Sequence, residues 1–237
     1  MTKRTVSPIL FLDFDGTISK RDVTDAILER YADSSWRTIE NEWRASRIGS
    51  RDCLSQQMAL VRASRRQLHA LVDSIEVDEG LNQLLDLCAA REFEAHIISD
   101  GFDYCINRIL ARAVNGRRSI IKSVHASNLR LVGDRWRTHF PHFHQSCGHG
   151  CGTCKPAVMR LLNPASAPAI FVGDGLSDRF AVTCADLVFA KSELARYCRR
   201  HDIEHISYTN LSEVADRLNV WLAARIFAPP TEQRATA

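Results

Sequence analysis

The segment Leu12-Asp13-Phe14-Asp15-Gly16-Thr17 closes a short apolar run that begins at Ile9. Carboxylates at positions i and i+2 of a strand lie on the same side. At the carboxyl end of a buried parallel strand, Asp13 and Asp15 would face the crevice where open α/β sheets bind ligands. Two like charges this close are unfavourable without a cation, and Mg²⁺ prefers oxygen ligands. The plainer interpretation is an Asp-Gly turn without a ligand.

Further apolar runs along the chain predict a parallel sheet. They are continuous rather than alternating, which is typical of strands covered on both faces. The five expected strands are residues 9–14, 95–99, 169–173, 187–190 and 205–208. The helical patterns around them are residues 79–91, 155–162, 177–184, 192–200 and 212–226. This alternation predicts an α/β fold with a doubly wound parallel sheet.

Residues 21–77 interrupt this alternation. They carry no strand signal and predict several helices, with breaks near Ser34, Gly49 and Ser64. A second exception, residues 123–139, predicts a small hairpin or ribbon around Gly133. The expected domains are a core of residues 1–20 and 78–227, an inserted helical cap of residues 21–77 and a disordered tail of residues 228–237.

The composition is that of an ordinary globular protein. Of 237 residues, 45% are hydrophobic and 25% are charged, and the net charge is only +3. This balance gives no argument for a nucleic-acid or membrane partner. The apolar run after Lys3 and Arg4 is too short for a signal peptide, so a cytoplasmic location is expected. A monomer and a homodimer, with residues 212–226 at the contact, both stay open.

Three other motifs place polar residues at a strand end or a helix start. The third expected strand, residues 169–173, runs into Asp174 and, four residues later, Asp178. Another strand ends at Ser99 and Gly101, whose hydroxyl and backbone N–H suit a phosphate oxygen. Lys155 opens a helix, followed by a proline at the favoured first turn. Taken singly, these motifs are also compatible with a helix cap, a turn and a solvated lysine.

The cysteine-rich segment before Lys155 offers metal ligands. Cys151 and Cys154 have the spacing of a zinc knuckle, and Cys147 or His149 could complete a structural Zn²⁺ site. Such a zinc ion would fix the loop that delivers Lys155 and would not be catalytic. The alternative is a glycine-rich loop with free thiols.

In combination and in order, the four motifs resemble those of the haloacid dehalogenase-like (HAD) phosphohydrolases. The resemblance covers about residues 8–208, and the inserted cap is similar to the C1 cap of the phosphoserine-phosphatase-type subgroup (IB). The stretches DFDGTI, ISDGFD and CGTCKP, which begin at Asp13, Ile98 and Cys151, look most like the methionine-salvage phosphatases. Those enzymes act on 2-hydroxy-3-keto-5-methylthiopentenyl-1-phosphate. The resemblance implies a Rossmann-like core and a Mg²⁺-dependent phosphomonoester hydrolase.

The resemblance also implies roles for the motif residues. Asp13 is expected to be the nucleophile that forms an aspartyl-phosphate, and Asp15 the general acid and base. Mg²⁺ is expected on an Asp13 oxygen, the Asp15 carbonyl and Asp174, while Asp178 holds a metal-bound water or orients Lys155. The expected phosphate-binding groups are Ser99, Gly101, Lys155 and Thr17.

Several alternatives stay open in this frame. Dehalogenases of the superfamily lack the second acid, so Asp15 favours phosphoryl transfer, although a phosphomutase shares the motifs. Phosphoserine phosphatases hold their substrate with an acid after the first motif and a cap arginine. Here Asp22 lies at about the place of the acid and Gln57 where the arginine is expected, which weakens this alternative. Pyridoxal phosphate and phosphocholine are further candidate substrates. The alternative to an enzyme is a non-catalytic binding protein of the same fold.

Overall fold

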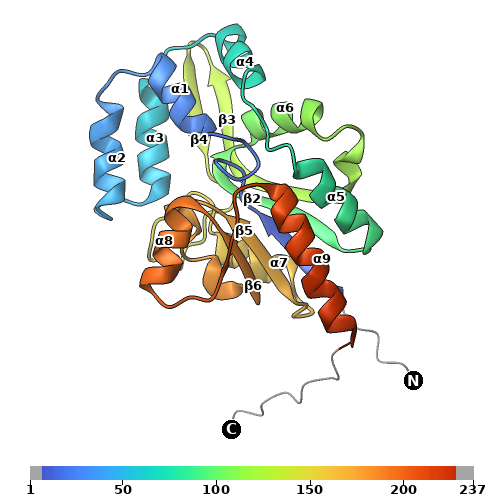
Figure 1. The fold of residues 1–237 in the computed structure, drawn as a ribbon. Coiled ribbons are helices and arrows are strands. Elements are labelled where there is room, and N and C mark those ends of the chain that lie inside the picture. The colour runs from blue at the N-terminus through green and yellow to red at the C-terminus, as the bar shows by residue number, and fades with distance from the viewer. Residues whose placement is uncertain (1–6, 228–237) are drawn as a thin grey trace.

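The computed structural model describes residues 7–227 and contains a seven-stranded sheet in the order β4-β3-β2-β1-β5-β6-β7 (Figure 1). All neighbouring strands pair in parallel except β4, which is antiparallel to β3. The strands are β1 (Ile9–Leu12), β2 (Glu94–Phe102), β3 (Ile121–Val132), β4 (Arg135–His139), β5 (Ala169–Gly173), β6 (Leu187–Ala190) and β7 (Ile206–Ser207). This arrangement confirms the predicted α/β fold with a doubly wound, mostly parallel sheet.

Helices cover both faces of the sheet, and the strand residues alternate between the two layers. Leu10 and Leu12 of β1 pack with α5 (Leu81–Ala90), α6 (Asp103–Ala113) and α9 (Leu211–Phe227). Phe11, between them, packs on the other face with α7 (Lys155–Leu162) and α8 (Ser192–Arg200). All three β1 side chains are fully buried. Each such burial stabilises the fold by roughly 1.5–3 kcal/mol, which ties the strand before Asp13 firmly into the core.

The helical segment, residues 21–77, lies at one end of the sheet, in the upper part of Figure 1. Its helices are α1 (Val23–Tyr31), α2 (Trp36–Arg44), α3 (Ser50–Leu60) and α4 (Arg65–Asp73). The breaks between them confirm the predicted ones near Ser34, Gly49 and Ser64. Ser64 begins α4 with a capping box, in which its hydroxyl accepts from the Gln67 backbone N–H. The segment is tied to the sheet by Trp136 of β4, whose Nε1 donates to the Ala63 carbonyl at 2.8 Å.

Three local predictions differ from the structure. Residues 177–184 form two short 3₁₀ turns instead of a helix, because the Asp178 carboxylate accepts from the backbone N–H groups of Asp174 and Gly175 and folds the chain back. The hairpin of residues 123–139 is not separate: its first strand, β3, joins the main sheet beside β2. Helix α6, which follows β2, is absent from the helices expected from the sequence.

The predicted disordered tail, residues 228–237, lies outside the described residues. Within residues 7–227, no helix combines the length and the apolar character needed to cross a membrane.

Candidate active site

The carboxyl ends of β1, β2 and β5 meet at one edge of the sheet, beneath the helical segment. Their register sets this meeting, because Leu12 lies beside Ile97 of β2 and Val172 of β5. A cavity of about 530 Å³ opens at this edge. Its floor includes Asp13, Asp15, Ser99, Gly101 and Asp174, and its walls come from α1, α2, α3 and the start of α8.

A buried lysine joins two of the predicted site residues. Lys155 Nζ donates to Asp13 Oδ1 at 2.7 Å and to Asp178 Oδ1 at 2.5 Å. Lys155 is only 1% exposed. Burial opposes its charge, but Asp13 and Asp178 outweigh that effect and hold the pKa of Lys155 above its ordinary value. Burial, together with Asp178, raises the pKa of the Asp13 carboxyl, and the Lys155 ammonium opposes that rise. The lysine therefore stays charged and offsets part of the negative charge of the Asp13, Asp174 and Asp178 cluster.

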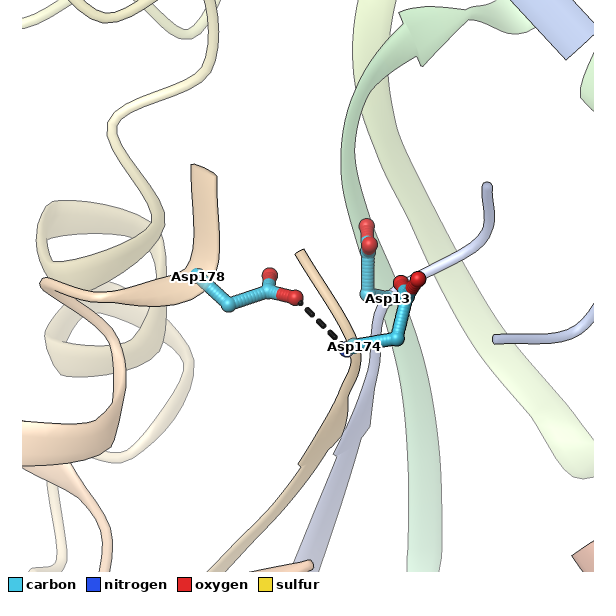
Figure 2. Close-up of side chains that lie close together, drawn as sticks. All are labelled: Asp13, Asp174 and Asp178. Carbon is cyan, nitrogen blue, oxygen red and sulfur yellow. Dashed lines mark hydrogen bonds between the residues drawn. The ribbon is translucent and has the colours of Figure 1, made fainter. Parts of the chain in front are cut away.

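The carboxylates of Asp13, Asp174 and Asp178 form a cluster that could hold a metal ion (Figure 2). One oxygen from each lies within 4.8 Å of the others, and no other such group occurs among residues 7–227. Asp178 is already engaged: Oδ1 accepts from Lys155, and Oδ2 accepts from the Asp174 N–H at 3.0 Å, the dashed line in Figure 2. Asp13 and Asp174 therefore offer the oxygens that remain available to a cation.

The electrostatics of Asp174 also fit a cation. Burial, and then the nearby Asp178, raises the pKa of Asp174 to about 6. A bound divalent cation would reverse this rise, because it is the largest local charge in such a site. The Thr17 hydroxyl donates to Asp174 Oδ1 at 3.2 Å and orients the carboxylate. Thr17 itself is fully buried behind Asp174 and does not line the cavity, so its role at the phosphate stays a prediction.

Asp15 lies at the boundary between the sheet edge and the helical segment. Its Oδ1 accepts from the Val23 N–H of α1 at 2.9 Å, and its Oδ2 lies 3.5 Å from the donating Ser99 hydroxyl. Burial, and then the negative charge of Asp22, raises the pKa of Asp15 well above its ordinary value. A raised pKa favours the protonated form of this carboxyl, and the protonated form is the one that a general acid needs.

Ser99 and Gly101 of β2 face Asp15 across the cavity floor. A Cβ at position 101 would collide with Asp15 Oδ2, so this close approach requires glycine. The Gly101 N–H donates to Ser99 Oγ at 3.0 Å and is therefore not free in this structure. Its predicted part in binding a phosphate oxygen requires the Ser99 side chain to turn.

The two residues predicted to set specificity, Asp22 and Gln57, both line the cavity. Asp22 begins α1 and accepts from the Asp25 N–H at 2.9 Å. Gln57 of α3 is buried, and its Nε2 donates to Glu40 of α2 at 3.1 Å. Both side chains are thus partly occupied within the helical segment.

Sequence reasoning missed other residues of the cavity wall. The main ones are Asp25, Glu40 and Trp43, together with Arg44, which donates to Glu40 and to Glu193 of α8 at 3.1 Å each. Acids and a tryptophan on short polar helices look the same in sequence whether they face solvent or a cavity. The one available signal was the pair of acids at the start of α1, which we interpreted only in part.

Asp25 gives a testable pH dependence of stability. Burial, and then Asp22 and Glu40, raises the pKa of Asp25 to about 7. An acid whose pKa is higher in the folded state stabilises the fold at low pH and loses that contribution as the pH rises from about 4 to 7. As the pH rises from 5 to 8, the wild type is expected to lose about 1–2 kcal/mol more of its unfolding free energy than Asp25→Asn. Urea unfolding at both pH values measures this, and equal pH slopes in the two proteins would contradict it.

The predicted zinc site is not supported. Cys147 interacts with the thiols of both Cys151 and Cys154. The ligand atoms of these residues do not all lie within 4.8 Å of one another, and the one cluster in residues 7–227 that meets this spacing is the aspartate cluster. His149 stacks on Phe180 with 3.8 Å between ring centroids. Residues 147–154 form a glycine-containing loop whose cysteines form no disulfide.

The four motifs thus meet at one edge of the sheet, around the pairing of Asp13 with Lys155. The model of the haloacid dehalogenase-like hydrolases matches residues 10–181, and the chain belongs to this family. The resemblance found in the four motifs is thereby confirmed.

Individual relatives are more specific. The chain is 29% identical to the 2-hydroxy-3-keto-5-methylthiopentenyl-1-phosphate phosphatase of Bacillus pumilus over 85% of this chain and 86% of that protein. It is 26% identical to the phosphatase of the same name from Geobacillus kaustophilus, over 92% and 97%. Among solved structures, a substrate-bound phosphoserine phosphatase complex matches 90% of this chain and 99% of its own, with a TM-score of 0.70 at 16% identity. A probable phosphoserine phosphatase from Vibrio cholerae matches 95% and 68%, with a TM-score of 0.69 at 15% identity. These structures show the shared fold.

Proposed function

We propose that this protein is a Mg²⁺-dependent phosphomonoester hydrolase that acts through an aspartyl-phosphate on Asp13. The observation that carries the proposal is the pairing of buried Asp13 with Lys155, next to Asp15 on the floor of a cavity. The Lys155 ammonium opposes the rise in the pKa of Asp13 and so favours its ionised, nucleophilic form. The raised pKa of Asp15 favours the protonated form that a general acid needs. The names of the relatives support the same activity.

The residues divide the reaction into two steps. Asp13 attacks phosphorus, the ester P–O bond breaks, and the leaving alkoxide takes a proton from Asp15. Water then attacks the phosphorus of the aspartyl-phosphate and gives a proton to Asp15. The bond between phosphorus and the Asp13 oxygen breaks, inorganic phosphate leaves, and both carboxyl groups return to their starting states. Lys155 and the Ser99 hydroxyl bind the phosphoryl oxygens, where negative charge spreads in the transition state.

The donor set fits Mg²⁺ at Asp13 and Asp174. Both offer carboxylate oxygens, which hard divalent cations prefer, and a cation would oppose the rise that burial and Asp178 cause in the pKa of Asp174. When bound, Mg²⁺ offsets the repulsion between the nucleophile and the phosphate and polarises the phosphoryl group. Asp178 supports the site through Lys155 and the Asp174 backbone.

Removal of divalent cations is expected to abolish phosphate release. We expect excess EDTA to lower the rate by at least about 100-fold, because the anionic nucleophile would then face an anionic substrate. Added Mg²⁺ should restore the rate, and Ca²⁺, with its longer bonds and irregular geometry, should restore much less. Continuous release of phosphate from p-nitrophenyl phosphate measures this. An undiminished rate in EDTA would contradict the role of the metal.

We further infer that the helical segment acts as a cap over a core of residues 7–20 and 78–227. Its support is the cavity wall, which takes residues from α1, α2 and α3 opposite the sheet edge. A cytoplasmic location and a monomeric or dimeric state stay predictions from the sequence.

For the substrate, we propose the ketopentenyl phosphate named in the relatives. Phosphoserine is disfavoured because the arginines of the helical segment on the cavity wall are already paired. Arg44 is held by Glu40 and Glu193, and Arg21 by Glu29 at 2.8 Å. Gln57 likewise donates to Glu40 and offers no charge. A substrate carboxylate could gain a bidentate arginine partner here only by displacing one of these carboxylates.

A substrate panel tests the proposal. Phosphate release would be compared for the ketopentenyl phosphate generated in situ, phosphoserine, pyridoxal phosphate and phosphocholine, each with Mg²⁺ and with EDTA. We expect the highest kcat/KM for the ketopentenyl phosphate. A preference for phosphoserine would overturn the substrate assignment. Absence of release from all four compounds, and also from the generic substrate p-nitrophenyl phosphate, would overturn the phosphatase assignment.

A further inference from the structure

One half-buried carboxylate at the sheet edge lines the cavity but has no part in the mechanism above. Asp100 lies between Ser99 and Gly101 on β2, and its two oxygens accept from two other parts of the chain. Oδ2 accepts from the Ser50 hydroxyl at 2.7 Å, and Oδ1 accepts from the Thr153 N–H at 2.7 Å. Asp100 therefore joins the first turn of α3 in the helical segment to the loop that leads into Lys155.

The same three parts are joined by further contacts. Ser50 Oγ accepts from the Gly152 N–H at 3.0 Å, so the hydroxyl bonds both to Asp100 and to the loop. The Arg51 N–H of α3 donates to the Gly150 carbonyl at 3.0 Å. A Cβ at position 49 would collide with this carbonyl, so the close approach of the two backbones requires glycine. On the sheet side, the Ser127 hydroxyl donates to the Asp100 carbonyl at 3.1 Å and fixes the β2 backbone.

The loop that Ser50 and Asp100 hold leads to the lysine that pairs with the nucleophile. Thr153 is two residues before Lys155, the first residue of α7, and Lys155 Nζ bonds to Asp13. Lys155 is held by its two carboxylate partners at one end and by the loop backbone at the other. A carboxylate only accepts hydrogen bonds, so a partner lost from the half-buried Asp100 leaves one of its oxygens short of a donor, and we expect the loop to shift in response.

We propose that Ser50 and Asp100 are positioning residues, which couple the seating of the helical segment over the cavity to the placement of Lys155 against Asp13. The inference rests on the proposed function for its kinetic consequence, while its structural consequence stands without it. Seating of α3 completes the Ser50 bonds to Asp100 and Gly152, and these bonds hold the loop in the position that aims Lys155.

Four variants test this coupling: Ser50→Ala, Asp100→Asn, the double variant, and Ser50→Thr, which keeps the hydroxyl. Ser64→Ala is the matched control. Ser64 is the N-cap of α4, and its hydroxyl bonds only to Gln67. With p-nitrophenyl phosphate and saturating Mg²⁺, we expect each of the first two to lower kcat by about 10- to 100-fold with a smaller change in KM. The double variant should be no slower than the slower single variant, because residues that act as a unit are not additive. Ser50→Thr should recover most of kcat, and Ser64→Ala should retain it.

Amide hydrogen exchange provides a readout that is independent of turnover. We expect the Gly152 and Thr153 amides to exchange faster in Ser50→Ala and Asp100→Asn, with unchanged exchange in β1 and β5. Normal kcat in Ser50→Ala together with low kcat in Asp100→Asn would overturn the coupling and indicate that Asp100 meets the substrate itself. Unchanged exchange of both amides would also overturn it. If the wild type releases no phosphate, the proposed function fails, and the exchange data alone decide the coupling.

Discussion

Asp13→Asn is expected to abolish turnover, lowering kcat by about 10⁴-fold or more. The amide keeps the size of the carboxylate but cannot attack phosphorus, so no aspartyl-phosphate forms. Lys155 keeps Asp178 as its partner, which preserves the buried ion pair and with it the fold. Steady-state release of phosphate from p-nitrophenyl phosphate at saturating Mg²⁺ measures the loss.

Two controls separate this loss from other effects. Asp134→Asn makes the same chemical change at an exposed carboxylate between β3 and β4 and should leave kcat unchanged. The Asp13→Asn protein should also unfold at a similar urea concentration to the wild type, which shows that the core is intact. Retention of a tenth or more of the wild-type kcat would contradict the nucleophilic role of Asp13.

The strands and the sheet edge were predictable because their signals are local. A continuous apolar run followed by acids marks β1, and the same pattern marks β5 before Asp174. Parallel pairing brings such strand ends together, so the meeting of Asp13 with Asp174 could be expected from the pattern alone. Lys155 was expected at the site only through the resemblance, because a lysine at a helix start is ordinarily exposed.

The features that were missed depend on contacts between distant parts of the chain. Ser-Asp-Gly at residues 99–101 has the composition of a turn, and the hydrogen-bond partners of Asp100 lie about 50 residues away on either side. The 3₁₀ turns after β5 replace the predicted helix because one side chain, Asp178, satisfies backbone donors that a helix start would leave open. Neither effect leaves a periodic signal. The cavity acids Asp25 and Glu40 are hidden for the same reason, since helix packing rather than pattern decides which face is covered.

The second large effect is expected for Asp15→Asn, and it depends on the leaving group. Nitrophenolate leaves without a proton, so the first step survives, whereas an alkoxide needs the acid. Hydrolysis of the aspartyl-phosphate needs Asp15 as a base with either substrate. With p-nitrophenyl phosphate, we therefore expect a burst of about one nitrophenolate per protein molecule, followed by a steady rate reduced by about 10²- to 10⁴-fold.

With an alkyl phosphate, the same variant should show neither a burst nor turnover. Rapid-mixing absorbance at millisecond resolution detects the burst, and intact-protein mass spectrometry after an acid quench detects one added phosphoryl group per protein molecule. The amide retains the size of Asp15 and an oxygen that can accept from the Val23 N–H, so the link to α1 should persist. Equal losses for aryl and alkyl substrates without a burst would mean that Asp15 supports the site structurally instead of moving protons. A burst with one substrate only ties the proton transfers to this carboxyl group, because geometry alone cannot distinguish the two leaving groups.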